Sequence, residues 1–263
     1  MSLVAKAYAL FREKGFLAYF KASIKYLRLS CYRRRGRYVF SAGSIRTVLH
    51  VIDEDDAVEL LYIRTTERCL VKEILNELKP GDIFWDIGAN LGFYALLAAG
   101  VPGVSAVAFE PNPATVKKLK NNIALNHRDN IKVLELALSD TESTVRFATM
   151  ENRGHGKAHI ALNSDGNNVE VKTDRGDKLV QTGAIPAPSV AKIDVEGAES
   201  LVLKGMQNIL AGCRTIFCEV HLQIQEYGGS AAELENVLKS AGFNLKNIQE
   251  RGHNTYHLKA SKM

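Results

Sequence analysis

The sequence predicts an α/β fold built on a mostly parallel β-sheet. Three observations support this prediction: buried strands and helices alternate from residue 82 onwards, a glycine-containing turn follows the first of these strands, and two closing strands form a terminal pair. Strand, helix and strand at such spacing form βαβ units with right-handed crossovers. The chain of 263 residues is 46% apolar and 24% charged, which suits one large α/β domain with a substantial core.

The N-terminal segment, residues 1–43, is predicted to be basic and helical, ahead of a domain over residues 44–263. Residues 1–40 hold ten Lys or Arg side chains and one acid, a net charge of +9, whereas the rest of the chain carries −4. Apolar side chains recur on one helical face at Leu17, Phe20, Ile24 and Leu27. The helix is expected to end before Cys31, because Gly36 breaks the stretch that follows.

Three roles remain open for this basic segment. Packing on its own domain, or on a second copy in a homodimer, is the first. A peripheral contact with an anionic membrane surface is the second, because basic side chains line a neighbouring face of the helix. Binding to nucleic acid or to an acidic substrate is the least favoured.

The first half of the domain is predicted element by element from its periodicity. Alternation over residues 45–52 and 58–64 indicates a hairpin across the acidic turn "DEDD", and an amphipathic helix over 67–79 stops at Pro80-Gly81. The βαβ rhythm then begins. Its elements are strand 82–88, helix 90–100, strand 104–110, helix 113–126 and strand 131–138.

The second half departs from this rhythm and then resumes it. Extra strands over 143–150 and 168–173 flank a polar loop over 151–168, which is typical of a lid or a binding loop. The later elements are strand 189–195, helix 198–210, strand 214–222, helix 231–242 and a terminal strand pair over 243–249 and 254–260.

Cysteine spacing and hydropathy bear on the location of the protein. The four cysteines have neither CxxC nor zinc-ligand spacing, which favours a reduced, cytoplasmic protein. No apolar run approaches the roughly 20 residues of a membrane span, and basic residues interrupt the apolar stretches near the N-terminus, unlike in a signal peptide. We therefore expect a cytoplasmic protein, membrane-associated if the basic helix contacts a bilayer.

The strongest local motif is "WDIGANLGFYA" over residues 85–95, where a strand runs into a helix. Gly88 and Gly92 permit the turn and a close backbone approach to a ligand, and Asp86 can reach the site from the strand end. The motif is neither GxGxxG nor GK[ST], so a P-loop is excluded and a dinucleotide site is disfavoured.

Glu110 ends the next predicted strand, 22 residues after Gly88. An acid at this place accepts hydrogen bonds from both ribose hydroxyls of an adenosine, so the glycine turn and Glu110 together predict a site for an adenosine-containing cofactor. NAD and S-adenosylmethionine both fit. Asp86 at the mouth of the turn suits a sulfonium compound with an amino group better than a pyrophosphate, which favours S-adenosylmethionine.

Five motifs follow one another along the chain: "DIGANLGFYA", "FEPNP", "ALSD", "KIDVEGAES" and "CEVH". In order and spacing they resemble the FkbM-type methyltransferases, and the resemblance covers roughly residues 60–258. It implies an S-adenosylmethionine-dependent enzyme with the Rossmann-like class I methyltransferase fold, in which a seven-stranded sheet has an antiparallel last strand. It leaves the first 40 residues unexplained.

The resemblance also assigns cofactor contacts by position. Glu110 would hold the ribose, Ala137 and Leu138 would lie beside the adenine, and Asp140 is a weaker candidate nearby. The methionine end of the cofactor would be held by the glycine-turn residues Asp86, Gly88, Asn90 and Gly92.

The acceptor site is expected where the strand that bears Asp194 ends. In the implied fold this strand lies beside the glycine-turn strand, so Asp194 faces the transferable methyl group. Glu219 and His221 lie two residues apart at the end of the next strand and share a face. These three are the predicted catalytic residues, with His221 as the base because histidine titrates near neutrality.

Other candidate residues have weaker predicted roles. The three catalytic side chains also suit a divalent metal, but direct acid–base chemistry is favoured and no metal site is predicted. Glu196 is expected to cap the following helix, and Trp85 to pack beneath the glycine turn. His155 and His159 of the polar loop are candidate acceptor contacts.

The motifs together predict an O-methyltransferase. Where amine-methylating enzymes carry Asn/Asp-Pro-Pro-Tyr/Phe, this chain has "DVEG", which favours an oxygen acceptor: a hydroxyl of a small molecule, a glycan or a lipid-linked acceptor. One alternative is a nicotinamide-dependent oxidoreductase, disfavoured by the missing GxGxxG. The other is a nucleic-acid-binding module that uses the basic N-terminal arm.

Overall fold

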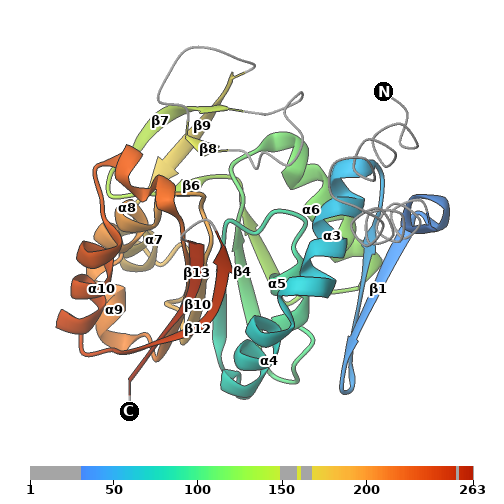
Figure 1. Ribbon diagram of the computed structural model, residues 1–263, viewed down its shortest axis with the longest axis horizontal. Coiled ribbons are helices and arrows are strands. Elements are labelled where there is room, and N and C mark those ends of the chain that lie inside the picture. Colours follow the sequence, from blue (N-terminus) through green and yellow to red (C-terminus); the bar gives the residue numbers. More distant parts are fainter. Residues whose placement is uncertain (1–30, 149–158, 161–167, 253–254, 263) are drawn as a thin grey trace, which may run out of the picture.

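The chain forms three layers, a central sheet between two groups of helices, in the computed structural model of Figure 1. The structure describes residues 31–148, 159–160, 168–252 and 255–262. Most of the predicted basic helix therefore lies outside the described residues. Residues 31–35 are helical, so the predicted end before Cys31 is too early: the helix ends at Gly36, whose φ of 61° is in the left-handed region.

The central sheet has seven strands in the order β12, β13, β11, β10, β3, β4, β5. All are parallel except β13, which runs antiparallel to both of its neighbours. This confirms the predicted seven-stranded sheet with an antiparallel last strand. The strands are β3 Ile83–Ile87, β4 Ser105–Phe109, β5 Ile131–Leu134, β10 Val190–Ile193, β11 Thr215–Val220, β12 Asn244–Gly252 and β13 Thr255–Ser261.

The order of the strands fixes where ligands can bind. From β3 the chain crosses to β4 on one side and later returns to β10 on the other, so the crossovers diverge at the carboxyl ends of β3 and β10. In open α/β sheets, ligands bind at this switch point. The antiparallel β13 ends at the bottom of Figure 1, beside the C-terminus, so the parallel strands point to the top of that view.

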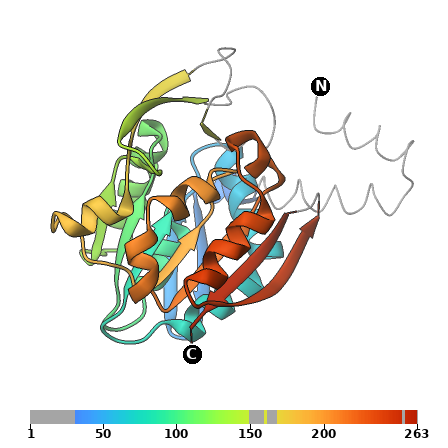
Figure 2. The ribbon, with the colours of Figure 1, turned by 90° about the vertical axis from the view of Figure 1, so that its left-hand side faces the viewer.

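Helices cover both faces of the sheet (Figures 1 and 2). One face carries α3 Glu54–Thr66, α4 Arg68–Glu77, α5 Phe93–Ala98 and α6 Pro113–Leu125. The other carries α7 Gly176–Gln181, α8 Glu199–Lys204, α9 Gln207–Gly212 and α10 Ala231–Ser240, with a 3-10 helix, η1, over Leu222–Tyr227. Successive side chains of a strand point to opposite faces of the sheet, so each strand contributes to both cores. On β3, Phe84 packs in the core beneath the first group of helices and Trp85 in the core beneath the second.

A second, four-stranded sheet lies at the carboxyl edge of the main sheet, at the top of Figure 1. Its order is β6 Ala137–Leu138, β9 Asn168–Asp174, β7 Ser143–Ala148 and β8 His159–Ile160. The single strand predicted over 131–138 is therefore wrong, because it divides between the two sheets. The amide of Glu110 donates to the carbonyl of Leu134 at the end of β4, and beyond that point β6 pairs with β9 instead.

The N-terminal hairpin is also corrected. It joins β1 Arg37–Ala42 to β2 Ile45–His50, so it spans residues 43 and 44, whereas residues 58–64, predicted as its second strand, belong to α3. The acidic "DEDD" begins that helix rather than a turn. Asp53 accepts a hydrogen bond from the amide of Asp56, whose side chain accepts one from the amide of Asp53, and this capping box outweighs the β-branched and aromatic character of the stretch.

The hairpin is attached to the domain through Asn122 of α6 and Asn126, the residue that ends this helix. The amide of Val48 donates to Oδ1 of Asn126 and the amide of His50 donates to Oδ1 of Asn122, each at 2.8 Å. The side-chain amides thus take the place of a neighbouring strand at this edge.

Another predicted element divides for a steric reason. The helix predicted over 198–210 is broken between α8 and α9 at Gly205, where a Cβ atom would lie 1.9 Å from the carbonyl oxygen of Ser139. The short α7 was not predicted. Within the described ranges, no helix has the length and apolar character needed to cross a membrane.

Candidate active site

The glycine turn connects β3 to α5 and is held by the end of β4. The amides of Gly88 and Ala89 both donate to the carbonyl of Phe109. Asn90, at φ 49°, and Gly92, at φ 84°, adopt left-handed backbone conformations, and Gly92 is the N-cap of α5. The turn therefore has a fixed backbone, with its amide groups at the carboxyl edge of the sheet.

The two glycines are required by contacts within the protein. A Cβ atom on Gly88, at φ 81°, would lie 1.9 Å from the carbonyl oxygen of Asp194, and one on Gly92 would lie 2.3 Å from a methyl group of Leu119. The close approach of these glycines to a ligand stays a prediction. Gly88 lets the end of β10 lie directly against the turn.

Glu110 lies beside this turn, as its position in the sequence predicted. Its two carboxylate oxygens each accept one backbone hydrogen bond at 2.9 Å, Oε2 from Asn90 and Oε1 from Asn112. Burial raises the pKa of Glu110 to about 7, and the charge of Asp86 adds to this, against the two amide donors. The structure therefore brings together the turn and the acid that together predicted an adenosine site.

Asp86 is fully buried on β3, and its two carboxylate oxygens differ in their hydrogen bonding. Oδ2 accepts a hydrogen bond from the amide of Ala95 in α5, at 2.8 Å, whereas Oδ1 has no hydrogen-bond partner in the described part of the chain. Burial raises the pKa of Asp86 to about 6, although the charge of Lys192 opposes the rise. A buried acceptor without a donor at this place fits the amino group expected of S-adenosylmethionine.

Strand register assembles the second half of the site. Lys192 on β10 lies opposite Asp86 on β3, and Asp194 follows two residues later on the same face. On the next strands, Glu219 of β11 lies opposite His257 of β13. Side chains far apart in the sequence therefore line one face of four neighbouring strands.

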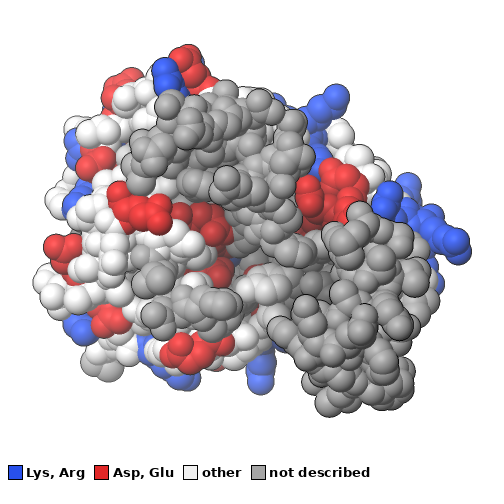
Figure 3. All heavy atoms as spheres, turned by 45° about the horizontal axis from the view of Figure 1, so that its top comes forward, with Lys and Arg blue, Asp and Glu red and all other residues white. Residues whose placement is uncertain are grey.

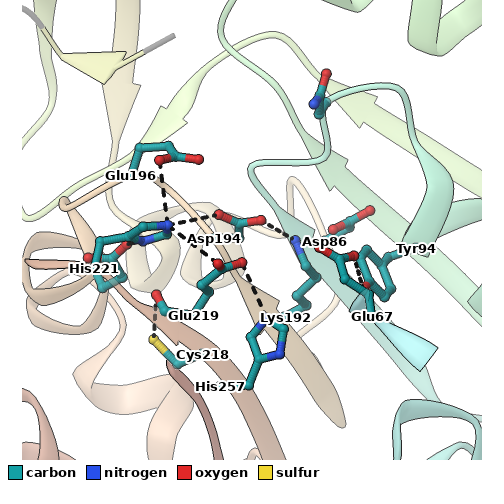
Figure 4. Close-up of polar contacts among 12 residues, drawn as sticks. Glu67, Asp86, Tyr94, Lys192, Asp194, Glu196, Cys218, Glu219, His221 and His257 are labelled. Atoms are coloured by element: carbon teal, nitrogen blue, oxygen red, sulfur yellow. Dashed lines mark hydrogen bonds and ion pairs between the residues drawn. The ribbon is translucent and has the colours of Figure 1, made fainter. Parts of the chain in front are cut away.

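His221 is the centre of this half of the site. It is 6% exposed, and its Nδ1 donates to Oε1 of Glu199 at 2.7 Å. Its Nε2 points to three carboxylate oxygens, 3.5 Å from Glu196, 3.7 Å from Glu219 and 3.9 Å from Asp194. Figure 4 shows Asp194, Glu196 and Glu219 turned toward His221. Together with Glu199, we call these residues the His221 cluster.

The carboxylates change the titration expected of His221. Burial alone would lower its pKa, but the hydrogen bond to Glu199 and the charges of Asp194, Glu196 and Glu199 outweigh burial and raise the pKa to about 9. The carboxylates thus shift the pKa of His221 upward from the near-neutral value predicted from the sequence.

Glu196 does not have its predicted capping role. The N-cap of α8 is Ala198, without a side-chain hydrogen bond, and the amide of Gly197 donates to Glu199. Glu196 instead sits at φ 53° and directs its carboxylate toward His221. The turn that follows β10 thus contributes Glu196 and Glu199 to the cluster.

Several residues of the site were missed by sequence reasoning. Lys192 forms an ion pair with Oδ2 of Asp194 at 3.0 Å and lies 4.7 Å from the ring centre of Tyr94, and Figure 4 shows it between Asp194 and Asp86. His257 donates to Oε2 of Glu219 at 3.3 Å. A lysine among the apolar residues of "VAKI" was the available signal, since buried lysines need partners.

The remaining predicted contacts are placed as follows. Ala137 and Leu138 form β6, and Leu138 is buried in the same core as Phe109. Their contact with the adenine stays a prediction. His155 lies outside the described residues, and His159 is placed only as part of β8. Trp85 is fully buried, as expected, and donates to the carbonyl of Pro186.

The edge of the sheet at which these residues lie has an acidic surface. Figure 3, in which the top of Figure 1 comes forward, shows several acidic side chains in the middle of that face. An acidic surface at a ligand site favours cationic or hydroxyl-bearing ligands over phosphates.

Comparisons with known proteins show the family to which the chain is similar. The model of the family described as "Methyltransferase FkbM domain" matches residues 86–245. The hexuronic acid methyltransferase AglP of Haloferax volcanii is 33% identical over 155 residues, 59% of this chain and 62% of AglP. The 31-O-demethyl-FK506 methyltransferase FkbM of Streptomyces tacrolimicus is 30% identical over 230 residues, 76% of this chain and 86% of that protein.

A third relative has a lower identity. The 2-O-methyltransferase NoeI of Sinorhizobium fredii is 26% identical over 158 residues, 54% of this chain and 64% of NoeI. The chain thus spans less than two thirds of the length of AglP and of NoeI.

Proposed function

The chain belongs to the FkbM family of methyltransferases and uses S-adenosylmethionine, and from this premise we propose that it methylates a hydroxyl oxygen of a small-molecule or glycan acceptor. A single observation carries the proposal. The carbonyl of Asp194 lies against Gly88, so the His221 cluster adjoins the turn expected to hold the methionine end of the cofactor. An acceptor bound at Asp194 would then be next to the methyl group.

Residues of the glycine turn and of the strand ends beside it would contact different parts of the cofactor. Glu110 would accept hydrogen bonds from the ribose hydroxyls, and Oδ1 of Asp86 would accept one from the amino group. Ala137 and Leu138 stay the residues proposed for the adenine. Bound S-adenosylmethionine supplies an electrophilic methyl group.

The His221 cluster would prepare the acceptor. Asp194 would accept the one hydrogen bond that the hydroxyl can donate, with Glu219 as a neighbouring acceptor, and this contact would orient a lone pair of the oxygen toward the methyl carbon. The cofactor would give up its methyl group and keep the electron pair of the C–S bond on sulfur, so the acceptor would lose only its hydroxyl proton. The hydroxyl proton passes into the cluster and then to solvent.

The names of the relatives support an oxygen acceptor. AglP is named for a hexuronic acid, FkbM for the 31-O-demethyl compound and NoeI for a 2-O position. A hydroxyl-rich acceptor also agrees with a site composed of carboxylates and an imidazole.

The proposal is tested by transfer of labelled methyl groups from S-adenosylmethionine to a panel of hexuronic acids, methyl glycosides and hydroxylated macrolides. We expect a product whose methyl group resists mild alkali, as an ether does, and a rate reduced roughly 1,000-fold in Asp194→Asn. Glu142→Gln, which changes an exposed carboxylate outside the site, is the matched control and keeps the rate.

Two results would contradict the proposal. An alkali-labile methyl group would identify a carboxylate as the acceptor, and an amine product would exclude oxygen altogether. Binding of S-adenosylhomocysteine by Asp194→Asn, measured by isothermal titration, shows that a loss of rate does not come from misfolding.

A further inference from the structure

The His221 cluster has a geometry that a hydrogen-bonded acid–base pair would not adopt. Nδ1 of His221 is fixed by Glu199, so the ring is oriented and Nε2 is directed into the cluster. The nearest carboxylate oxygens lie 3.5, 3.7 and 3.9 Å from Nε2, too far for a good hydrogen bond. A buried imidazole nitrogen therefore faces three acidic oxygens at ion-pair distances, each longer than a typical hydrogen bond.

Each of these side chains is held through its other polar atom. Lys192 pairs with Oδ2 of Asp194, so Oδ1 faces His221. His257 donates to Oε2 of Glu219, so Oε1 faces His221. Outer partners that orient the inner ligands in this way, above all a carboxylate on the second nitrogen of a histidine, are typical of metal sites.

The spacing of the inner atoms suits one small cation. Ligand bonds of about 2.1 Å place neighbouring ligands about 3.0 Å apart and opposite ligands about 4.2 Å apart in octahedral geometry. The atoms of Asp194, Glu219 and His221 that could bind an ion all lie within 4.8 Å of one another. We propose that these three residues, with Glu196 beside them, bind one divalent metal ion.

The types of ligand atom indicate which ion would bind. Because the ligand set combines carboxylates with an imidazole, it favours ions of the Mn²⁺ to Zn²⁺ class over Ca²⁺, which takes oxygen ligands.

The ion has a role if the proposed function is correct, and this part of the inference rests on that function. An ion at Asp194 lies beside the glycine turn and would bind an acceptor through a hydroxyl and a neighbouring hydroxyl or carboxylate. Coordination lowers the pKa of the bound hydroxyl. The acceptor class is then narrowed to chelating diols and hydroxy acids.

The direct test measures Mn²⁺ binding to the full chain without cofactor or acceptor. Protein treated with EDTA and then desalted is titrated with Mn²⁺, and free ion is followed by its EPR signal, with Zn²⁺ and Mg²⁺ as competitors. We expect one saturable site per chain, displaced by Zn²⁺ at lower concentration than by Mg²⁺.

Matched variants locate the site. Asp194→Asn, Glu219→Gln and His221→Gln should each weaken Mn²⁺ binding at least 10-fold, whereas the exposed Glu142→Gln should not change it. Glu199→Gln, a change at a positioning residue, should weaken it 10- to 100-fold. Glu196→Gln, at the more exposed rim, serves as a conservative variant if the others fail to fold.

The outcomes separate the ion from the proposed function. Absence of saturable binding, or binding that Asp194→Asn leaves unchanged, overturns the site even if methyl transfer to a hydroxyl is observed. Saturable binding that the variants abolish supports the site even if no hydroxyl is methylated. Full transfer activity in EDTA, with the site intact, overturns the role assigned to the ion.

Discussion

The two ends of the active site are built differently. At the cofactor end, the carboxylates are bound by backbone amides: Glu110 by Asn90 and Asn112, and Asp86 by Ala95. At the acceptor end, the carboxylates mainly meet other side chains: Lys192 of β10, His257 of β13 and His221 after β11, although Glu199 also accepts a hydrogen bond from the amide of Gly197. A site whose carboxylates bind backbone amides can be predicted from short sequence motifs. A site whose carboxylates bind other side chains depends on strand register, which such motifs do not contain.

The contact of Gly88 with Asp194 joins the two ends, and Gly88→Ala should break it with the largest effect. The new Cβ would lie 1.9 Å from a carbonyl oxygen at a φ of 81°, so we expect the free energy of unfolding to fall by roughly 5 kcal/mol. Urea denaturation measures this. Gly81→Ala is the control, since its φ of 91° is similar but nothing lies within 4 Å of its Cβ position. An equally large loss of stability in Gly81→Ala would show that backbone strain, and not the contact with Asp194, is responsible.

Lys192→Met tests whether the acceptor end depends on side-chain charge. The variant removes the ion pair between the buried Lys192 and the partly buried Asp194, and we expect a loss of roughly 3 kcal/mol in the free energy of unfolding, measured in EDTA. Lys120→Met removes an exposed ion pair with Glu135 and should cost less than about 0.5 kcal/mol. Equal losses in the two variants would contradict a buried, interdependent cluster.

At the cofactor end, the contribution of Glu110 to the free energy of unfolding should depend on pH. Folding raises the pKa of Glu110 from 4.5 to about 7, so between these values the folded chain binds more protons than the unfolded one. The stabilising contribution of this carboxyl is present below pH 4.5 and is lost as pH rises through 7, by up to about 3 kcal/mol. Comparison of urea denaturation of the wild type and of Glu110→Gln from pH 4 to 8 measures it, and parallel curves would contradict it.

The smallest expected effect is on the affinity for the cofactor, which should distinguish the two ends of the site. Glu110→Gln removes the carboxylate proposed to bind the ribose hydroxyls, and we expect binding of S-adenosylhomocysteine to weaken about 30-fold, or about 2 kcal/mol. Glu219→Gln at the acceptor end should change this affinity no more than a few-fold. Isothermal titration measures both, and a reversed order would mean that the two ends are wrongly assigned.

Much of the fold followed from local pattern. Each strand of the central sheet and the helices α4, α5, α6 and α10 were predicted near their observed positions. The failures had physical causes that periodicity does not contain: the capping box that makes 58–64 helical, and the close approach of Gly205 to Ser139 that divides a helix. The strand predicted over 131–138 divided because β4 offered no further pairing.

By itself, the sequence determined the parallel sheet, the glycine turn with Glu110, and the placing of Asp194, Glu219 and His221 at strand ends, since each depends on neighbours within a few residues. Only the tertiary structure decided what these side chains meet. Lys192, Glu199 and His257 join the site through strand register and a turn, and the carboxylates that raise the pKa of His221 come together only when β10 and β11 pair. Electrostatic interactions act over distances in space, which a one-dimensional pattern does not record.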